Sequence, residues 1–284
     1  MANIYLDYAA TSRKHFDIIE KNMNILKEIY ANPSSSHTLG KKNDRLAREG
    51  REKIAKTLNA SSNEIIFNSG GTESNNTVFN HVLTRFETGE IIISSIEHPS
   101  VKASAKRLER FGFKVHELSV DESGAISLEE LKDKINSKTV LISIMLANNE
   151  TGVLNPIKEV SELIADKNIL LHSDIVQALG KVEIDVKELG LDFASASAHK
   201  IGSLNNFGFL YAKDGDVEPL LLGGGQENGL RSGTTDLLGI LVLNDCLSET
   251  LNSIPALREL KNYFISELEK NEVEFEVNGS IENS

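Results

Sequence analysis

The sequence predicts an α/β protein with a three-layer α/β/α large domain, in which helices cover both faces of a mostly parallel sheet. Short apolar runs alternate with helical patterns along most of the chain, an order typical of βαβ units. The apolar runs are continuous rather than alternating, as expected for strands whose two faces are both buried. The 284 residues suffice for a large domain and a smaller one.

The expected elements follow one another from the amino terminus. A short strand at 4–7 comes first, and helical patterns at 16–30 and 41–58 follow. The later elements are a strand at 65–68, a helix from Gly71, a strand at 91–95, a helix opened by Pro99, a strand at 114–118, a helix at 128–135, a strand at 140–144, a helix at 157–166, a strand at 169–172 and a strand-like run within 191–200. Pro99 suits a first helical turn, because the N–H that proline lacks would have no partner there.

The pattern changes near residue 250. Two helices, at 237–251 and 257–270, are separated at Pro255, and the strictly alternating run at 273–277 predicts a half-exposed strand. We therefore expect three regions: an N-terminal segment at 1–14 that packs with the small domain, a large domain at 15–250, and the start of an incomplete small α+β domain at 251–284.

Composition restricts the partners of the protein. The net charge of −12 disfavours nucleic acid and anionic membranes as partners. No apolar run approaches the roughly 18 residues that a membrane span requires. The single cysteine, Cys246, rules out an internal disulfide framework and favours a cytoplasmic location. No metal site is expected.

Lys200 and Asp174 are the sharpest candidates for chemistry. Lys200 closes a run that becomes small and polar just before the amine, and Asp174 ends an apolar strand. A buried acid is costly unless it is paired, and a protonated pyridine is a suitable partner. A lysine that holds an aldehyde as a Schiff base, with an acid at a pyridine nitrogen, is what a pyridoxal 5'-phosphate site requires. Taken alone, Lys200 would more often be a solvated lysine at a strand end.

Further candidates follow other strand ends, where ligands bind to open parallel sheets. The glycine turn before Gly71 and Thr72 suits a phosphate at a helix start. His98 would stack on a cofactor ring and exchange protons, and Gln177 would donate to the ring oxygen. The remaining candidates are polar side chains near the same edge: Asn149, Ser197, His199 and Thr234. Each alone has an ordinary structural explanation, but their joint occurrence at successive strand ends favours a cofactor site.

Taken together, these segments resemble the class V aminotransferase superfamily and, within it, the cysteine desulfurases of the NifS/IscS type. The matching segments cover nearly the whole chain in the family's order: 5–11, 32–37, 70–75, 97–98, 148–150, 172–177, 197–200 and 223–234. The resemblance implies a fold-type-I pyridoxal phosphate-dependent transferase, and a homodimer with active sites at the subunit interface.

The resemblance also assigns a role to each candidate. Lys200 would be the Schiff-base lysine and His98 the proton-handling residue above the ring. Asp174 would pair with the ring nitrogen and Gln177 would contact the ring oxygen. The other cofactor-binding positions would be Gly71, Thr72, Ser197 and His199 at the phosphate, Asn149 beside the ring and substrate, and Thr234 at the phosphate of a second subunit.

Such an enzyme would convert L-cysteine to L-alanine and pass the sulfur to an enzyme cysteine, for a sulfur acceptor or an iron–sulfur scaffold protein.

Two departures from the family matter. The stretch 201–206 replaces the usual Gly-Pro-Lys-Gly turn, and the sequence lacks the segment that carries the persulfide-forming cysteine and a carboxylate-binding arginine. Cys246 lies on the apolar face of a helical pattern and is expected in the core. We therefore expect the cofactor steps to occur, with weak or absent desulfuration.

Other assignments share the same lysine and acid. A selenocysteine lyase or a β-eliminating lyase of the same superfamily would need both Lys200 and Asp174. A non-catalytic, shortened copy of a desulfurase is the third alternative.

Overall fold

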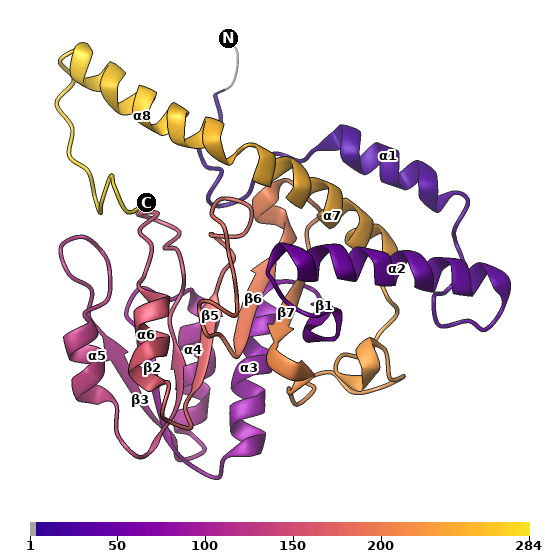
Figure 1. Ribbon diagram of the computed structural model, residues 1–284, viewed down its shortest axis with the longest axis horizontal. Coiled ribbons are helices and arrows are strands. Elements are labelled where there is room, and N and C mark those ends of the chain that lie inside the picture. Colours follow the sequence, from indigo (N-terminus) through magenta and orange to yellow (C-terminus); the bar gives the residue numbers. More distant parts are fainter. Residues whose placement is uncertain (1–3) are drawn as a thin grey trace.

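A computed structural model describes residues 4–284, so residues 1–3 of the predicted N-terminal segment lie outside the described part. Its centre is a seven-stranded sheet of order β1-β7-β6-β5-β4-β2-β3 (Figure 1). The strands are β1 (Ile65–Asn68), β2 (Glu90–Ser94), β3 (Lys114–Leu118), β4 (Thr139–Ser143), β5 (Leu170–Asp174), β6 (Phe193–Ser197) and β7 (Gly208–Ala212). β7 runs antiparallel to both β1 and β6, while the β6-β5-β4-β2-β3 neighbours are parallel. The mostly parallel sheet predicted from the apolar runs is confirmed.

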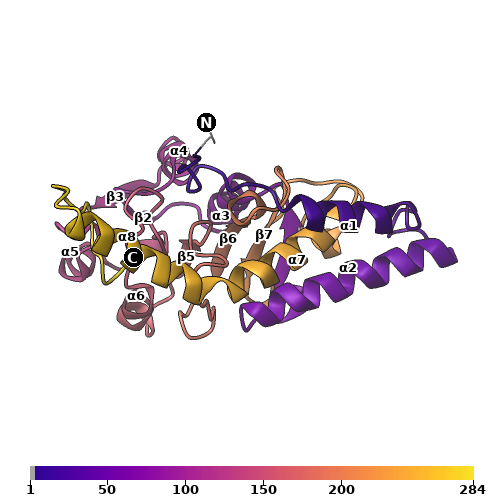
Figure 2. The same ribbon diagram turned by 90° about the horizontal axis from the view of Figure 1, so that it is seen from above.

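Helices cover both faces of this sheet. They are α1 (Phe16–Leu26), α2 (Thr38–Thr57), α3 (Gly71–Arg85), α4 (Pro99–Glu109), α5 (Leu128–Lys134), α6 (Ile157–Ile164), α7 (Leu237–Asn252) and α8 (Ile254–Lys270). Seen from above, α3 and α4 lie on one side of the strands, and α2, α6 and α7 lie on the other (Figure 2). The three-layer prediction is therefore confirmed.

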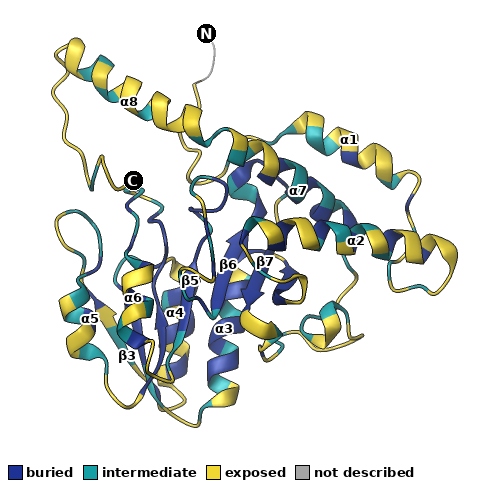
Figure 3. Ribbon diagram, viewed as in Figure 1, coloured by how far each residue is buried: buried dark blue, intermediate teal, exposed yellow. Residues whose placement is uncertain are grey.

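Two apolar cores result, one on each face of the sheet. In β2, Ile91 and Ile93 pack into the core beneath α3 and α4, whereas Ile92 packs into the opposite core. Successive strand side chains point to opposite faces, and these three isoleucines are all at most 1% exposed. Apart from the edge strand β3, the strands are accordingly mostly buried, as is much of α3 (Figure 3).

Local signals fix where the helices around the site begin. Pro99 occupies the first turn of α4, and the His98 side chain caps that helix by accepting a hydrogen bond from the Ser100 N–H. Asp236 caps α7 in the same way through the Gly239 N–H. Such caps satisfy N–H groups that have no partner within the helix.

Two predicted strands are wrong. Residues 4–7 and 273–277 have irregular backbones in the structure. Alternation can mark a strand, but a strand also needs a neighbour for its backbone hydrogen bonds, and 273–277 has none among residues 4–284. The apolar side chains of Val273, Phe275 and Val277 are consequently 36–46% exposed.

The two helices predicted at 237–251 and 257–270 are confirmed as α7 and α8, with Pro255 in the first turn of α8. α7 buries seven residues, whereas α8 buries none and extends away from the sheet (Figure 3). Within residues 4–284, no single helix is long and apolar enough to cross a membrane; α7 and α8 reach that length and apolarity only as a pair bent by 52°.

Candidate active site

A cavity of about 990 Å³ lies where the carboxyl ends of β4, β5 and β6 meet the starts of α3 and α4. Parallel strands end at the same edge, so side chains far apart in sequence converge there. Nine of the ten predicted site residues line this cavity: Gly71, Thr72, His98, Asn149, Asp174, Gln177, Ser197, His199 and Lys200. The tenth, Thr234, lies elsewhere.

A second cavity, of about 930 Å³, lies beside the junction of α7 and α8. Its walls are mostly aliphatic, and none of the predicted site residues lines it. Size alone does not distinguish the two cavities. The chemistry does, because the first one gathers a lysine, a buried carboxyl and a helix start.

The Lys200 amine follows β6 and lies in a partly buried position. Its Nζ donates hydrogen bonds to the carbonyls of Ala9 and Ala10, the second at 2.9 Å. Burial lowers the pKa of Lys200, and the charge of Asp174 opposes this in part. A lowered pKa increases the neutral fraction of the amine, which is the form that attacks carbonyl carbons.

Asp174 ends β5 and is only 4% exposed. Its carboxylate accepts hydrogen bonds from the Asn75 side chain at 2.9 Å and from the Val176 N–H at 3.0 Å. Burial raises the pKa of Asp174, while these hydrogen bonds and the nearby Lys200 lower it. A carboxylate so deeply buried is stabilised most by a cationic partner inside the cavity.

His98 connects β2 to α4 at the cavity wall. The Ser100 N–H lies 3.2 Å from Nδ1 of His98, and a backbone N–H can only donate. Nδ1 is therefore unprotonated, and the neutral ring carries its proton on Nε2. His98 thus offers a defined proton-bearing nitrogen.

The start of α3 forms a cradle for an anion. Gly70 has φ +120°, in the region that favours glycine. A Cβ on Gly71 would lie 2.7 Å from a methyl group of Val176, so only glycine fits without a shift. The first N–H groups of this 15-residue helix have no partner within the helix. Thr72 and Ser197 line the same part of the cavity, and Ser197 Oγ would lie 3.1 Å from a Cβ built on Gly70.

Gln177 is held by a lysine that the sequence did not suggest. Lys181 Nζ donates to Oε1 of Gln177 at 2.8 Å, and Nε2 of Gln177 donates to the Ala9 carbonyl at 2.9 Å. The amide is therefore oriented with its N–H₂ group on the Ala9 side. Burial and the charge of Lys200 lower the pKa of Lys181 to about 8.

His199 and the N-terminal segment lie side by side. His199 Nδ1 is 3.2 Å from Thr11 Oγ1, and the His199 carbonyl accepts from the Ser12 N–H at 3.2 Å. Burial, followed by the charge of Lys200, lowers the pKa of His199 to about 4. Farther along, His15 N–H donates to the Gly202 carbonyl, within the stretch that departs from the usual family turn.

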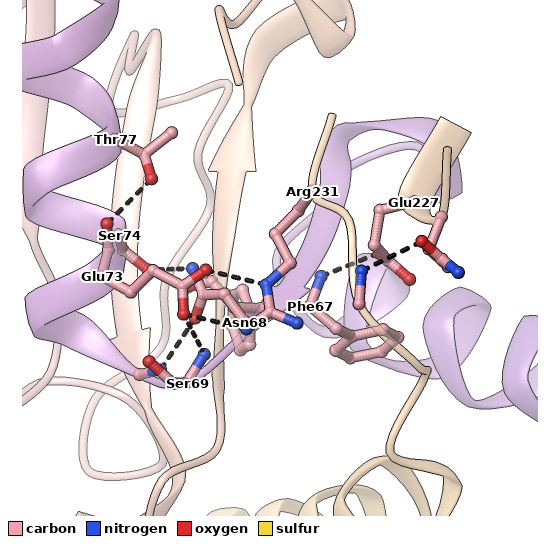
Figure 4. Close-up of polar contacts among 12 residues, drawn as sticks. Phe67, Asn68, Ser69, Glu73, Ser74, Thr77, Glu227 and Arg231 are labelled. Atoms are coloured by element: carbon pink, nitrogen blue, oxygen red, sulfur yellow. Dashed lines mark hydrogen bonds and ion pairs between the residues drawn. The ribbon is translucent and has the colours of Figure 1, made fainter. Parts of the chain in front are cut away.

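Thr234 is exposed and lines a separate, smaller cavity with Arg231 and Glu227. Two ion pairs hold the glycine-rich stretch that carries Thr234 against the rest of the domain. Figure 4 shows one of them, between Arg231 and Glu73. Arg231 binds both carboxylate oxygens of Glu73, at 2.8 and 3.1 Å. Arg51 binds both oxygens of Glu227, one of them at 2.8 Å.

The Arg231–Glu73 pair also reaches the anion cradle. Glu73 lies in the first turn of α3, and its carboxylate accepts the Ser69 N–H at 2.9 Å (Figure 4). Glu73 therefore holds the turn that leads into Gly70 and Gly71. A connection of this kind between two distant segments is not readable from sequence spacing.

Glu97 is a buried acid to which the sequence assigned no role. Its Oε1 accepts hydrogen bonds from Ser94 Oγ at 2.5 Å and from the Met145 N–H at 2.7 Å. Burial raises the pKa of Glu97 to about 8. The residue joins the end of β2 to the segment that carries Asn149.

Cys246 is fully buried in α7, as expected from its place on an apolar helical face. Burial raises the pKa of its thiol to about 12. Since the thiolate is the reactive form, this setting favours a packing role for Cys246 and disfavours a role as nucleophile.

Comparison with known proteins agrees with this geometry. The family profile described as aminotransferase class V matches residues 4–257. A protein named cysteine desulfurase IscS from Dictyoglomus turgidum is 41% identical over 99% of this chain and 73% of its own length. A protein of the same name from Clostridium botulinum is 38% identical over 97% of this chain and 71% of its own length.

Solved structures give the same result. A structure entitled NifS-like protein superposes with a TM-score of 0.94 and 35% identity, covering all of this chain and 80% of the other. A structure entitled SspA in complex with cysteine has a TM-score of 0.83 and 35% identity, covering 87% of this chain and 72% of its own. From this agreement of sequence and structure, the chain belongs to the cysteine desulfurase family within the class V aminotransferases.

Proposed function

We propose that the chain is a pyridoxal 5'-phosphate-dependent cysteine desulfurase that takes L-cysteine as substrate and yields L-alanine and transferable sulfur. The observation that carries this proposal is one cavity lined by the Lys200 amine, the buried Asp174 carboxyl and the glycine-flanked start of α3. The relatives named cysteine desulfurase support it.

The residues of the cavity fit pyridoxal phosphate. Asp174 needs a cationic partner, which a protonated pyridine nitrogen supplies. The free N–H groups at the start of α3, together with Thr72, Ser197 and His199, suit a phosphate. When bound, the cofactor supplies an aldehyde for covalent attachment to an amine and a ring that accepts electrons from the substrate.

The residues of this chain then have defined tasks. Lys200 supplies the amine for that covalent attachment, in a setting that favours its neutral form. His98 holds a proton at Nε2, in reach of groups in the cavity. Gln177 presents its N–H₂ group to the ring oxygen, and Asn149 lies beside the ring and the substrate.

The proposal extends to partners and location. Since Cys246 is buried in the core, we propose that the sulfur passes to an enzyme cysteine other than this one and from there to a sulfur acceptor or an iron–sulfur scaffold protein. We further propose a homodimer, in which Thr234 contacts the cofactor phosphate of a second copy. The single cysteine suits the reducing cytoplasm.

Product analysis tests this function. The purified chain should bind pyridoxal phosphate and, with L-cysteine and excess dithiothreitol, should release alanine and sulfide in equal amounts but at a weak rate at most, while Lys200→Ala should release neither. Pyruvate in place of alanine would instead indicate a β-eliminating lyase. Alanine from L-selenocysteine but not from L-cysteine would indicate a selenocysteine lyase. Cofactor binding without product would agree with the absent desulfuration expected of this chain, whereas failure to bind pyridoxal phosphate would contradict the proposal.

A further inference from the structure

One buried amide lies between the two sides of the proposed cofactor site. Asn75, on α3, is fully buried. Its Nδ2 donates one hydrogen bond to Asp174 Oδ2 and a second to Ser100 Oγ, both at 2.9 Å. A single N–H₂ group thus contacts β5 through Asp174 and α4 through Ser100.

The orientation of this amide is fixed by its neighbours. If the oxygen and nitrogen were exchanged, a carbonyl oxygen would face the Asp174 carboxylate, and both are acceptors. In the orientation observed, Oδ1 of Asn75 is buried without a hydrogen-bond partner. A buried acceptor without a partner lowers the free energy of unfolding. The contact with Asp174 gives a functional reason for an asparagine at this position in spite of that loss.

The second hydrogen bond continues to His98. Because Ser100 Oγ accepts from Asn75, its own proton is free to be donated to His98 Nδ1, 2.7 Å away. The Ser100 N–H donates to the same nitrogen. The N–H contact requires an unprotonated Nδ1, and the hydroxyl donates to this nitrogen as well, so together they favour the tautomer with the proton on Nε2.

We propose that Asn75 and Ser100 are positioning residues that couple Asp174 to His98. This inference rests on the proposed function. The chain of hydrogen bonds would hold the Asp174 carboxylate in the orientation that a ring nitrogen requires, and it would fix which nitrogen of His98 carries the proton in the same cavity. Neither residue touches the reacting atoms. Asn75 acts through Asp174 and Ser100, and Ser100 acts through His98.

Cofactor affinity provides the first test. Asn75→Ala removes a hydrogen bond to a charged carboxylate and should weaken pyridoxal phosphate binding by about tenfold or more. Ser100→Ala keeps the hydrogen bond between Asn75 and Asp174, so its affinity should stay within about threefold of the wild type. Fluorescence titration with the cofactor measures both values.

The tautomer of His98 provides the second test and needs no cofactor. In ¹⁵N spectra of the cofactor-free protein, the chemical shift of Nδ1 reports whether this nitrogen is protonated, and His98→Gln identifies the signal. Asn75→Ala and Ser100→Ala should both move the signal part of the way toward that of a protonated Nδ1, because they weaken or remove the hydroxyl contact and leave the Ser100 N–H as the donor that favours the unprotonated form. A merely structural role for Asn75 would leave the signal unchanged, because Asn75 does not contact His98.

Matched controls come from the same fold. Asn43 is also buried, donates two hydrogen bonds to the carbonyls of Ile29 and Ala31, and has an unpartnered Oδ1. Ser104 lies one turn after Ser100 on α4 and is buried. Asn43→Ala and Ser104→Ala should change neither cofactor affinity nor the His98 signal.

The inference is overturned if Asn75→Ala behaves like Asn43→Ala in both measurements. Should Asn75→Ala not fold, Ser100→Ala alone decides: an unchanged His98 signal refutes the coupling, and a shifted signal with near-normal affinity supports it. Failure of the wild type to bind pyridoxal phosphate would refute the proposed function instead. In that case the spectra of the cofactor-free protein would still test the chain of hydrogen bonds from Asp174 to His98.

Discussion

Arg231→Ala should destabilise the fold, because it leaves Glu73 without its cationic partner. At 2.8 Å, two unit charges attract by about 6 kcal/mol for an effective dielectric constant of about 20, and desolvation offsets much of this. The side chains of Arg231 and Glu73 are 25% and 10% exposed. The pair therefore falls between exposed pairs, worth about 0–1 kcal/mol, and buried pairs, whose breaking costs about 3–5 kcal/mol.

We expect a loss of about 2 kcal/mol in the free energy of unfolding, and a decrease of about 5 °C in Tm for a protein of this size. Thermal unfolding followed by circular dichroism measures this change. The hydrogen bonds from Arg231 and Ser69 more than offset burial and lower the pKa of Glu73. The stabilisation is therefore present above the ordinary glutamate pKa and is lost as the pH falls through the lowered value.

An exposed ion pair supplies the control. Arg85 binds Asp216 with side chains that are 49% and 63% exposed, so Arg85→Ala should cost at most about 1 kcal/mol. The double variant Glu73→Ala/Arg231→Ala should be more stable than Arg231→Ala alone, because it leaves no unpaired buried carboxylate. Equal Tm values for Arg231→Ala and Arg85→Ala would refute the reasoning.

Three further substitutions test other parts of the account. Gly71→Ala should weaken cofactor binding severalfold in fluorescence titrations, because its Cβ would lie 2.7 Å from Val176. The double variant Gly71→Ala/Val176→Ala should regain the cofactor affinity, and an affinity that stays low would contradict a steric cause. Burial lowers the pKa of Lys181 from 10.5 to about 8, so the charged amine destabilises the fold below about pH 8, and this destabilisation decreases as the pH rises above 8. Relative to Lys181→Met, the free energy of unfolding of the wild type, measured with denaturant, should therefore increase by about 2 kcal/mol between about pH 8 and pH 9.5. A difference that stays constant over this range would refute the reasoning. Cys246→Ala should lower the stability by about 1–2 kcal/mol but leave thiol-dependent sulfide release unchanged, and loss of release at full cofactor occupancy would show that this thiol accepts the sulfur.

Sequence patterns predicted the framework well because each signal was local. Continuous apolar runs identified the buried strands, and Pro99 identified the start of α4. Polar residues after these strands, such as Asp174 and Lys200, were expected to meet because parallel strands end at one edge. The structure brings nine of the ten candidates to one cavity, while their roles remain predictions.

Other features required the three-dimensional arrangement. The run at 273–277 alternates like a strand, but alternation does not say whether a neighbouring strand exists. Asn75 lies within a matching segment, yet only the fold shows that it touches both Asp174 and Ser100. Lys181 was missed because nothing in its local sequence shows that its amine points back to Gln177.

The central claim is that the amine of Lys200 is the group to which the cofactor becomes attached. Borohydride treatment of the protein with pyridoxal phosphate, followed by peptide mapping by mass spectrometry, tests this directly. The account predicts one modified lysine, Lys200, and no modification of Lys200→Ala at comparable cofactor concentration. Modification of Lys181 or of scattered surface lysines, with Lys200 unmodified, would contradict it.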